Sequence, residues 1–412
     1  MGETVIEKII RNNVGKTVKP GDIVTVNVDR VMIHDIFIPF VAEKFEEMGF
    51  TKLWDPDKAV LIYDHLVPAS QLDDTRHFHA GDAFARKYGM KNVHRSDGIC
   101  HQLMTEAGYV KPGNIVFGTD SHTTTYGCVG AFSSGIGYTE MASILGTGTM
   151  WIKVPETIKV VVDGELPENV MSKDIILRLI GDLGADGATY RALEFTGSTV
   201  KNMTVASRMT MANMAIEAGA KCALFTPDEK TAEYCGIELN DFQKSLSGDT
   251  DATYIKTITY RAEDFVPVMA CPSQVDKIRD VSDLEGTEID QVFIGSCTNG
   301  RLEDLKAAAE VLKGKKVAKY VKLIVTPASR KIYRQAIDMG IMDVLAEAGA
   351  IITHPGCGLC CGRTGGILTD GERVVATNNR NFLGRMGTSK VEIYLASPKT
   401  AAACAMAGKI VK

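Results

Sequence analysis

The sequence predicts an α/β protein of more than one domain. Short apolar runs typical of strands alternate with longer amphipathic runs typical of helices, most regularly in the last third of the chain. With 412 residues, 45% of them hydrophobic, the chain can bury large cores and is too long for one compact core. We expect three α/β units, which are residues 1–153, 154–280 and 281–412.

In the first unit, two strand-like runs each lead into a polar loop; the runs are residues 59–63 and 114–117. The first loop carries Asp64 and His65. We expect Asp64 to orient the loop or a second group rather than the His65 ring, because adjacent side chains of an extended segment point apart. The second loop offers groups that can exchange protons, but they are also ordinary turn and helix-cap residues; they are Asp120, Ser121 and His122.

The second unit is expected to open at Val154 with a strand over 157–162, followed by a helix with Ser172 at its N-cap. Residues 245–288 are polar and charged, which is typical of a linker or surface excursion. His101 in the first unit and Glu194 in the second stand in apolar surroundings, where an unpaired charge is costly. They are either site residues or a buried polar pair.

The third unit is predicted to be a doubly wound α/β domain, because strand and helix alternate along it. The expected strands are 289–294, 321–325, 350–353, 373–376 and 391–395, and the expected helices are 301–312, 330–339 and 398–407. Cys297 follows the first of these strands, and Cys357 and Cys360 follow the third. Loops at the carboxyl ends of parallel strands meet at one edge of a sheet, so we expect these cysteines to meet.

Three thiolates can hold an iron–sulfur cluster that is one ligand short, and the iron without a thiolate can bind substrate. With His354 nearby, the same cysteines could form a Cys3His zinc site, or they could be ordinary buried thiols. Cys361 is expected not to be a ligand, because it adjoins Cys360. The remaining cysteines are expected to be core or surface thiols; they are Cys100, Cys128, Cys222, Cys235, Cys271 and Cys404.

The segment 376–385 offers Arg380 and Arg385 with flanking amides that include Asn379. Guanidinium groups bind carboxylates through two parallel hydrogen bonds, so this segment is a candidate anion clamp; a solvated arginine loop is the alternative.

Composition excludes several classes of protein. The net charge of −5 and pI near 6.0 give no overall basic surface for nucleic acid. No stretch is long and apolar enough for a membrane span, and the N-terminal residues do not resemble a signal peptide. Ten cysteines without a secretory signal favour a reducing, cytoplasmic location over a disulfide framework.

Taken together, these motifs resemble the aconitase and isopropylmalate isomerase family, specifically its separate large subunit. The likeness runs from Asp64-His65 through the Gly-Thr-Asp-Ser-His motif, the segment 208–219 and the cysteine motifs to Asn-Arg-Asn-Phe-Leu-Gly-Arg. It implies three α/β domains around a [4Fe-4S] cluster, and a hydro-lyase that reversibly removes water from a 2-hydroxy dicarboxylic acid.

The resemblance also implies a role for each matching residue. Cys297, Cys357 and Cys360 would bind the cluster and leave one iron without a cysteine. His65 beside Asp64 would protonate the departing hydroxyl. The groups around the iron-bound oxygen would be His101, Asp120, His122 and Glu194. The groups holding substrate carboxylates would be Ser121, Asn379, Arg380 and Arg385.

In this family a swivelling domain supplies a serine base and a substrate arginine. The chain ends at Lys412, soon after the cluster unit, so we expect a small swivel-domain subunit to complete the site. The sequence departs from the family pattern at Phe37 and Pro39, where relatives place a Thr-x-Gln segment, and at Leu359 and Cys361. Apolar groups in place of an amide favour an alkyl-bearing substrate.

The expected function is therefore the large subunit of a dehydratase for an alkylated malate of the 3-isopropylmalate type. A 2,3-dimethylmalate or 2-methylmalate dehydratase is the close alternative, and homoaconitate hydratase comes third. Two different classes remain: an RNA-binding regulator in the cluster-free form, against which the acidic balance argues, and a zinc-stabilised structural protein.

Overall fold

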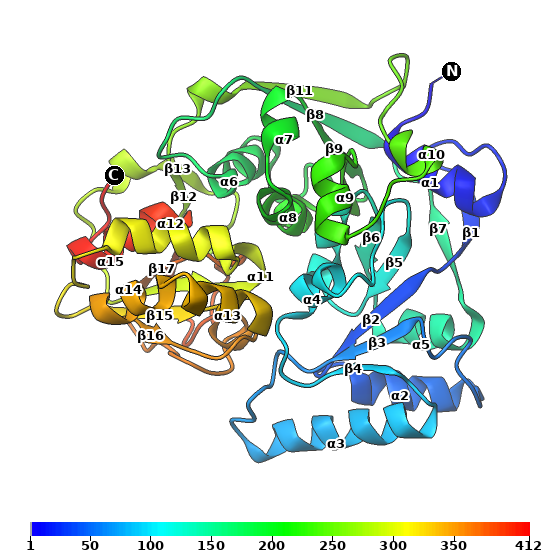
Figure 1. Cartoon of the computed structure of the whole chain (residues 1–412), viewed down its shortest axis with the longest axis horizontal. Helices are drawn as coiled ribbons and strands as arrows, with labels where there is room; N and C mark the ends of the chain where they lie inside the picture. Colours follow the sequence, from blue (N-terminus) through cyan, green and yellow to red (C-terminus); the bar gives the residue numbers. More distant parts are fainter. Residues whose placement is uncertain (1) are drawn as a thin grey trace.

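The computed structural model describes residues 2–412, which form three larger sheets flanked by helices and one two-stranded sheet (Figure 1). The chain passes from a blue and cyan unit, through a green one, to a yellow and red one. No helix within residues 2–412 is long and apolar enough to cross a membrane.

The first sheet has five parallel strands in the order β4-β3-β2-β5-β6. These strands are β2 Arg30–His34, β3 Ala59–Ile62, β4 Asn92–His94, β5 Ile115–Gly118 and β6 Phe132–Gly135. The helices of this unit are α1 Val5–Val14, α2 Ile38–Glu47, α3 Leu72–Lys87, α4 Cys100–Glu106, the 3-10 helix η1 Ser121–Val129 and α5 Tyr138–Thr147. A separate antiparallel pair joins β1 Ile23–Asn27 to β7 Thr149–Lys153.

The second sheet has four parallel strands in the order β10-β9-β8-β11. These strands are β8 Thr157–Asp163, β9 Ala192–Thr196, β10 Cys222–Phe225 and β11 Lys256–Arg261. The helices are α6 Ser172–Leu183, α7 Ser198–Asn202, α8 Val205–Met214, η2 Ala215–Ala218, α9 Glu229–Cys235, α10 Asp241–Lys244 and η3 Ala262–Asp264.

The third sheet has seven strands in the order β13-β12-β18-β17-β14-β15-β16. The parallel strands are β14 Gln291–Gly295, β15 Lys322–Thr326, β16 Ile351–Ile352, β17 Arg373–Ala376 and β18 Glu392–Leu395. Antiparallel β12 Val268–Ala270 and β13 Ile278–Asp280 extend one edge. The helices are η4 Val281–Leu284, α11 Ser296–Asn299, α12 Leu302–Leu312, α13 Arg330–Asp338, α14 Ile341–Ala348, η5 Gly358–Cys361 and α15 Pro398–Ala407.

The predicted α/β class is confirmed, and the doubly wound third unit stays a prediction. Central strands such as β14 are buried at every residue, as expected for a parallel sheet covered on both faces. The strand order reverses between β2 and β5 in the first sheet and between β14 and β17 in the third. Ligands of open α/β sheets bind beyond the carboxyl ends of strands at such reversals.

Two local predictions for the second unit are wrong. Met171, not Ser172, precedes helix α6, and the Asp174 carboxylate accepts the Met171 N–H at 2.8 Å. The predicted linker 245–288 contains β11, β12 and β13. Strand β11 is an edge strand with no buried residue, so its polar sequence resembles that of a linker. The domain boundaries stay predictions, although β12 and β13, which precede residue 281, belong to the third sheet.

Candidate active site

Asp64 and His65 lie just beyond the carboxyl end of β3, where the chain bends. The Asp64 Oδ1 atom lies 2.7 Å from His65 Nδ1, and Asp64 Oδ2 accepts the Cys100 N–H at 2.7 Å. The expectation that Asp64 would not bond the neighbouring ring is wrong, because the bend at His65 turns the two side chains toward each other. The carboxylate thus fixes both the histidine and the start of α4.

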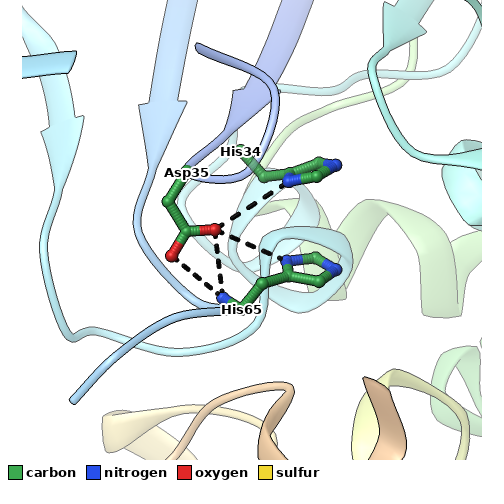
Figure 2. Close-up of side chains that lie close together, drawn as sticks. All are labelled: His34, Asp35 and His65. Atoms are coloured by element: carbon green, nitrogen blue, oxygen red, sulfur yellow. Dashed lines mark hydrogen bonds and ion pairs between the residues drawn. The ribbon is translucent and has the colours of Figure 1, made fainter. Parts of the chain in front are cut away.

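Asp35, at the end of β2, holds the same loop from the other side (Figure 2). Its carboxylate accepts the backbone N–H groups of His65, at 3.1 Å to the nearer oxygen, and of Leu66, at 2.8 Å. The His34 ring stacks on the His65 ring, with centroids 4.2 Å apart, and Phe37 meets the edge of His34 at 5.1 Å. His65 is therefore held on its backbone, its ring face and its Nδ1 atom.

Asp120, beyond the end of β5, is both a helix cap and a member of a histidine network. Its Oδ1 atom accepts the His122 N–H at 2.8 Å and lies 2.9 Å from His101 Nε2 and 3.2 Å from His122 Nδ1. Its Oδ2 atom is 3.8 Å from His65 Nε2. The hydroxyl of Ser121 lies 3.5 Å from His122 Nδ1. One carboxylate therefore connects all three predicted histidines.

Glu194 does not join this network, and Glu217 does. Glu217 Oε1 lies 2.9 Å from His122 Nε2 and accepts from Arg380 Nε at 2.8 Å. Glu194 accepts instead from the Val5 N–H at 3.0 Å and the Tyr254 hydroxyl at 2.7 Å. The predicted role of Glu194 and its alternative pairing with His101 are both wrong, because β9 directs Glu194 toward the N-terminal helix.

Cys297 follows β14 through a tight turn. Ser296 has φ of +73°, in the left-handed region that non-glycine residues rarely adopt, and a Cβ on Gly295 would lie 2.6 Å from the Thr326 carbonyl oxygen. Such strained backbone is concentrated at functional sites. The turn places Cys297, 6% exposed, at the start of α11.

Cys357 and Cys360 lie in the loop after β16 and are also buried. The backbone N–H of Cys357 donates to the Asp64 carbonyl oxygen at 2.7 Å. This bond joins the cysteine loop of the third unit to the Asp64–His65 loop of the first. Sulfur atoms and acid–base groups therefore occupy one site between the two sheets.

Amide and guanidinium groups surround the sulfur atoms. Asn213 Nδ2 lies 3.3 Å from Cys297 Sγ, and Asn379 Nδ2 lies 3.5 Å from it. Asn379 Oδ1 is 3.8 Å from Cys360 Sγ, so Asn379 bridges the two sulfur atoms. Arg385 Nη2 lies 4.0 Å from Cys360 Sγ. The contacts of Asn379 are thus with sulfur, while its predicted substrate role stays a prediction.

Charge–charge contacts set the protonation states. Burial lowers the pKa of His65, but Asp64, Cys361 and Asp35 together raise it by more, to well above its ordinary value. Burial raises the pKa of Asp120, but bonds to His101 and His122 lower it well below its ordinary range. Burial lowers the pKa of His101. At neutral pH, His65 thus carries a proton that it can donate beside an ionised Asp120.

The donor set fits an iron–sulfur cluster better than a single zinc ion. Within residues 2–412, two groups of metal-ligating side chains have their ligand atoms within 4.8 Å of one another, and neither contains a cysteine. Around tetrahedral zinc with Zn–S of about 2.3 Å, sulfur ligands would lie about 3.8 Å apart. At least one pair among Cys297, Cys357 and Cys360 therefore has sulfur atoms more than 4.8 Å apart, and N–H donors around Cys297 suit anionic sulfur.

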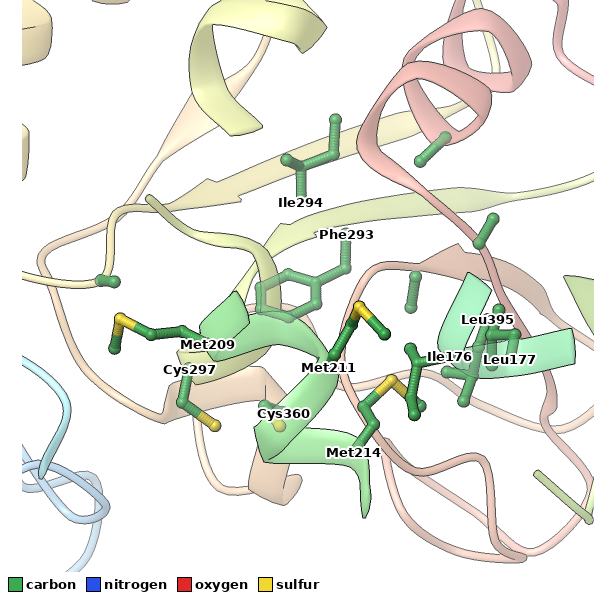
Figure 3. Close-up of a cluster of buried hydrophobic side chains, with 14 of the residues drawn as sticks. Ile176, Leu177, Met209, Met211, Met214, Phe293, Ile294, Cys297, Cys360 and Leu395 are labelled. Atoms are coloured by element: carbon green, nitrogen blue, oxygen red, sulfur yellow. The ribbon is translucent and has the colours of Figure 1, made fainter. Parts of the chain in front are cut away.

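An apolar layer closes the far side of the cysteines. Met209 and Met211 of α8 pack with Phe293 of β14 beside Cys297 and Cys360 (Figure 3). These side chains are fully buried. The layer keeps water from that side of the sulfur atoms, where electrostatic interactions are correspondingly stronger.

Sequence reasoning missed three members of the site. They are Glu217, Asn213 and Tyr126, whose hydroxyl lies 3.3 Å from His101 Nδ1. Glu217 and Asn213 lie in the segment 208–219, which is part of the family resemblance. That resemblance was the sequence signal from which both residues could have been predicted as members of the site.

Comparisons with known proteins place similar sequences along the entire chain. The model of the aconitase family (aconitate hydratase) matches residues 7–408. The chain is 47% identical over 411 residues to "3-isopropylmalate dehydratase large subunit 1" of Methanopyrus kandleri, covering 100% of this chain and 98% of the relative. It is 46% identical over 413 residues to "3-isopropylmalate dehydratase large subunit 2" of Archaeoglobus fulgidus, with the same coverage. The holo-form of aconitase X from Thermococcus kodakaraensis shares the fold, with TM-score 0.52 and 14% identity over 89% of this chain and 87% of that one.

Proposed function

The chain belongs to the aconitase family, and we propose that it is the large subunit of a hydro-lyase that reversibly dehydrates 3-isopropylmalate. The observation that supports this proposal is that the cysteine loop of the third unit contacts the Asp64–His65 loop of the first unit. The Cys357 loop bonds directly to the Asp64–His65 loop, so cysteine sulfur and a protonated histidine face one space.

The family implies a [4Fe-4S] cluster, and Cys297, Cys357 and Cys360 would hold three of its irons. When bound, the cluster supplies a Lewis-acidic iron that polarises the substrate hydroxyl. The side chains of Asn213 and Asn379 would hold the Cys297 sulfur by their N–H groups. The three cysteines form no group with all sulfur atoms within 4.8 Å among residues 2–412, and this spacing and the N–H donors support the cluster over zinc.

The chain's own groups supply the proton chemistry. His65, kept protonated by Asp64, donates its Nε2 proton to the departing hydroxyl, and Asp120 lies 3.8 Å from that nitrogen to orient it. His101 and His122 hold Asp120 in place. On the reverse path His65 accepts the proton from water.

The substrate carboxylates would be bound by Arg380, Arg385 and Ser121. Arg380 is fixed at Nε by Glu217, which leaves the terminal nitrogens of its guanidinium group to receive a carboxylate. Fixing an arginine in advance reduces the entropy lost on binding.

A small subunit is implied by the large-subunit names of the relatives. We propose that it is a swivel-domain protein that supplies the serine base and a substrate arginine. The predicted cytoplasmic location stays a prediction.

A second substrate class is favoured by one contact. Phe37 packs against His34, which stacks on His65, so an apolar ring lies one side chain away from the acid. This arrangement suits the methyl groups of 2,3-dimethylmalate or 2-methylmalate as well as an isopropyl group.

The test is an ultraviolet assay of double-bond formation with the chain and its small subunit, prepared without oxygen. We expect 3-isopropylmalate to be dehydrated faster than 2,3-dimethylmalate, 2-methylmalate or homocitrate. Faster dehydration of a methylated malate would move the assignment to the second class, and no turnover of any of the four would refute the hydro-lyase proposal.

A further inference from the structure

The first turn of α6 is buried between the second and third sheets. Figure 1 draws α6 beside the yellow and red unit. Lys173 and Asp174 in this turn are 0% exposed. Asp174 Oδ1 accepts the Val268 N–H of strand β12 at 3.1 Å. The helix of one unit is therefore fixed to the sheet of the next.

Lys173 makes the deeper contact. Its Nζ atom donates to the carbonyl oxygen of Thr377 at 2.8 Å and to that of Asn378 at 2.6 Å. These carbonyl groups come just after β17, at the reversal of strand order in the third sheet. The two residues that follow them, Asn379 and Arg380, are the ones whose side chains reach Cys297 and Glu217.

The same loop is tied to the Cys297 turn. The Thr377 hydroxyl accepts the Gly295 N–H at 2.9 Å and lies 3.2 Å from the Gly295 carbonyl oxygen. A continuous series of bonds thus runs from Lys173 through Thr377 to Gly295, two residues before Cys297. Movement of Lys173 would displace both the sulfur-bearing turn and the arginine-bearing loop.

Packing alone does not explain why a lysine occupies the buried position 173. Burying an ammonium group is costly, and an apolar residue of similar volume avoids that cost. Burial lowers the pKa of Lys173 to about 7, while the sulfur of Cys360, Asp304 and the sulfur of Cys297 oppose that change. Burial alone therefore disfavours the charged form of Lys173, and the anionic sulfur of a bound cluster would favour it.

We propose that Lys173 is a positioning residue of the active site, which holds the 377–380 loop in place and, with a cluster bound, supplies a positive charge near the cysteine sulfur atoms. The effect on the loop belongs to the chain itself. The effect on a bound cluster rests on the proposed function.

The test compares Lys173→Met with Arg178→Met. Arg178 is a second cation of α6 that crosses to the third sheet, where it binds Asp280 at 2.6 Å, but it is partly exposed and remote from residues 377–380 in the bond network. Each variant is measured as cluster-free chain by amide hydrogen exchange. Each is then loaded and measured for iron and sulfide content, reduction potential, KM and kcat.

In Lys173→Met we expect amide exchange at 377–381 to rise about tenfold or more, because two buried hydrogen bonds from Lys173 Nζ are lost. The loaded variant should lose cluster about 10–100-fold faster, as is usual when a partner behind a metal ligand is removed. Its reduction potential should fall, because a positive charge is gone, and KM should rise more than kcat falls. Arg178→Met should match the wild type in all of these.

Unchanged exchange at 377–381 in Lys173→Met would overturn the positioning role, whatever the chain catalyses. Raised exchange with an unchanged potential and cluster lifetime would overturn the charge role alone. If Lys173→Met does not fold, Lys173→Gln carries the test, because its amide keeps the hydrogen bonds without the charge. We expect it to restore protection of the loop but not the potential; equal potentials would contradict the charge role.

Discussion

Replacing Glu217 by glutamine tests the assembly of the acid–base network most sharply. The carboxylate is 6% exposed and contacts His122 Nε2 at 2.9 Å and Arg380 Nε at 2.8 Å. Glutamine keeps the shape and one acceptor oxygen but removes the negative charge. Arg380, whose side chain is 22% exposed, would lose its counterion.

Removing one partner of a buried ion pair costs about 3–5 kcal/mol. We expect a loss of unfolding free energy near the lower end, because Arg380 keeps some access to water. Burial raises the pKa of Glu217, but His122 and Arg380 lower it by more, so it lies below the ordinary 4.5. The carboxylate therefore stabilises the fold above pH 4.5, and this stabilisation disappears as the pH falls through the lowered pKa.

The assay is denaturant unfolding of Glu217→Gln and wild type at neutral pH and in acid, together with kcat/KM of the loaded enzyme. The difference in unfolding free energy should shrink in acid, and kcat/KM should fall about 10–100-fold, as for other partners that orient site residues. Glu194→Gln is the matched control. Burial raises the pKa of Glu194, so neutralising it should cost little stability and leave kcat/KM unchanged. A Glu194→Gln enzyme that is inactive beside an active Glu217→Gln would refute the reasoning.

Five further substitutions probe the rest of the site. Arg380→Lys should keep the cluster but raise KM about 10–100-fold, since a charged hydrogen bond worth about 1.5–3 kcal/mol is lost; steady-state kinetics with an unchanged KM would remove its carboxylate role. His65→Asn should lower kcat about 10²–10⁴-fold with the fold intact. Asp64→Asn should move the alkaline limb of the pH–rate profile to lower pH, because the carboxylate that raises the pKa of His65 is gone. An alkaline limb at the wild-type pH in Asp64→Asn would contradict the assignment of His65 as the acid. Cys360→Ser should lose labile sulfide in a colorimetric assay while Cys361→Ser retains it, and the opposite pattern would exchange their roles.

Much of the fold was predictable because parallel strands are apolar along their whole length. Strands β15, β17 and β18 and helix α15 lie within a residue of their predicted bounds. Strand β11 was not predictable in this way, since its exposed edge position allows polar residues. The start of α6 was misplaced because its first turn is capped by Asp174 from within the helix, not by a residue before it.

Site residues that directly follow strands could be predicted from the sequence. Where two residues of the same type were available, only tertiary packing determined which one joins the site. The sequence offers two buried glutamates in the second unit, and only the three-dimensional arrangement distinguishes Glu217 from Glu194. The Asp64–His65 contact depends on a backbone bend at His65 that the local sequence does not predict. The hydrogen bond from Lys173 to Thr377 joins residues more than 200 positions apart, and a local sequence pattern cannot predict such a contact.

The most direct test of the central claim is iron and acid-labile sulfide analysis of the chain purified without oxygen together with its small subunit. We expect about four irons and four sulfides per chain, and we expect both to be lost in Cys297→Ser. Zinc without labile sulfide in the wild-type chain would contradict it.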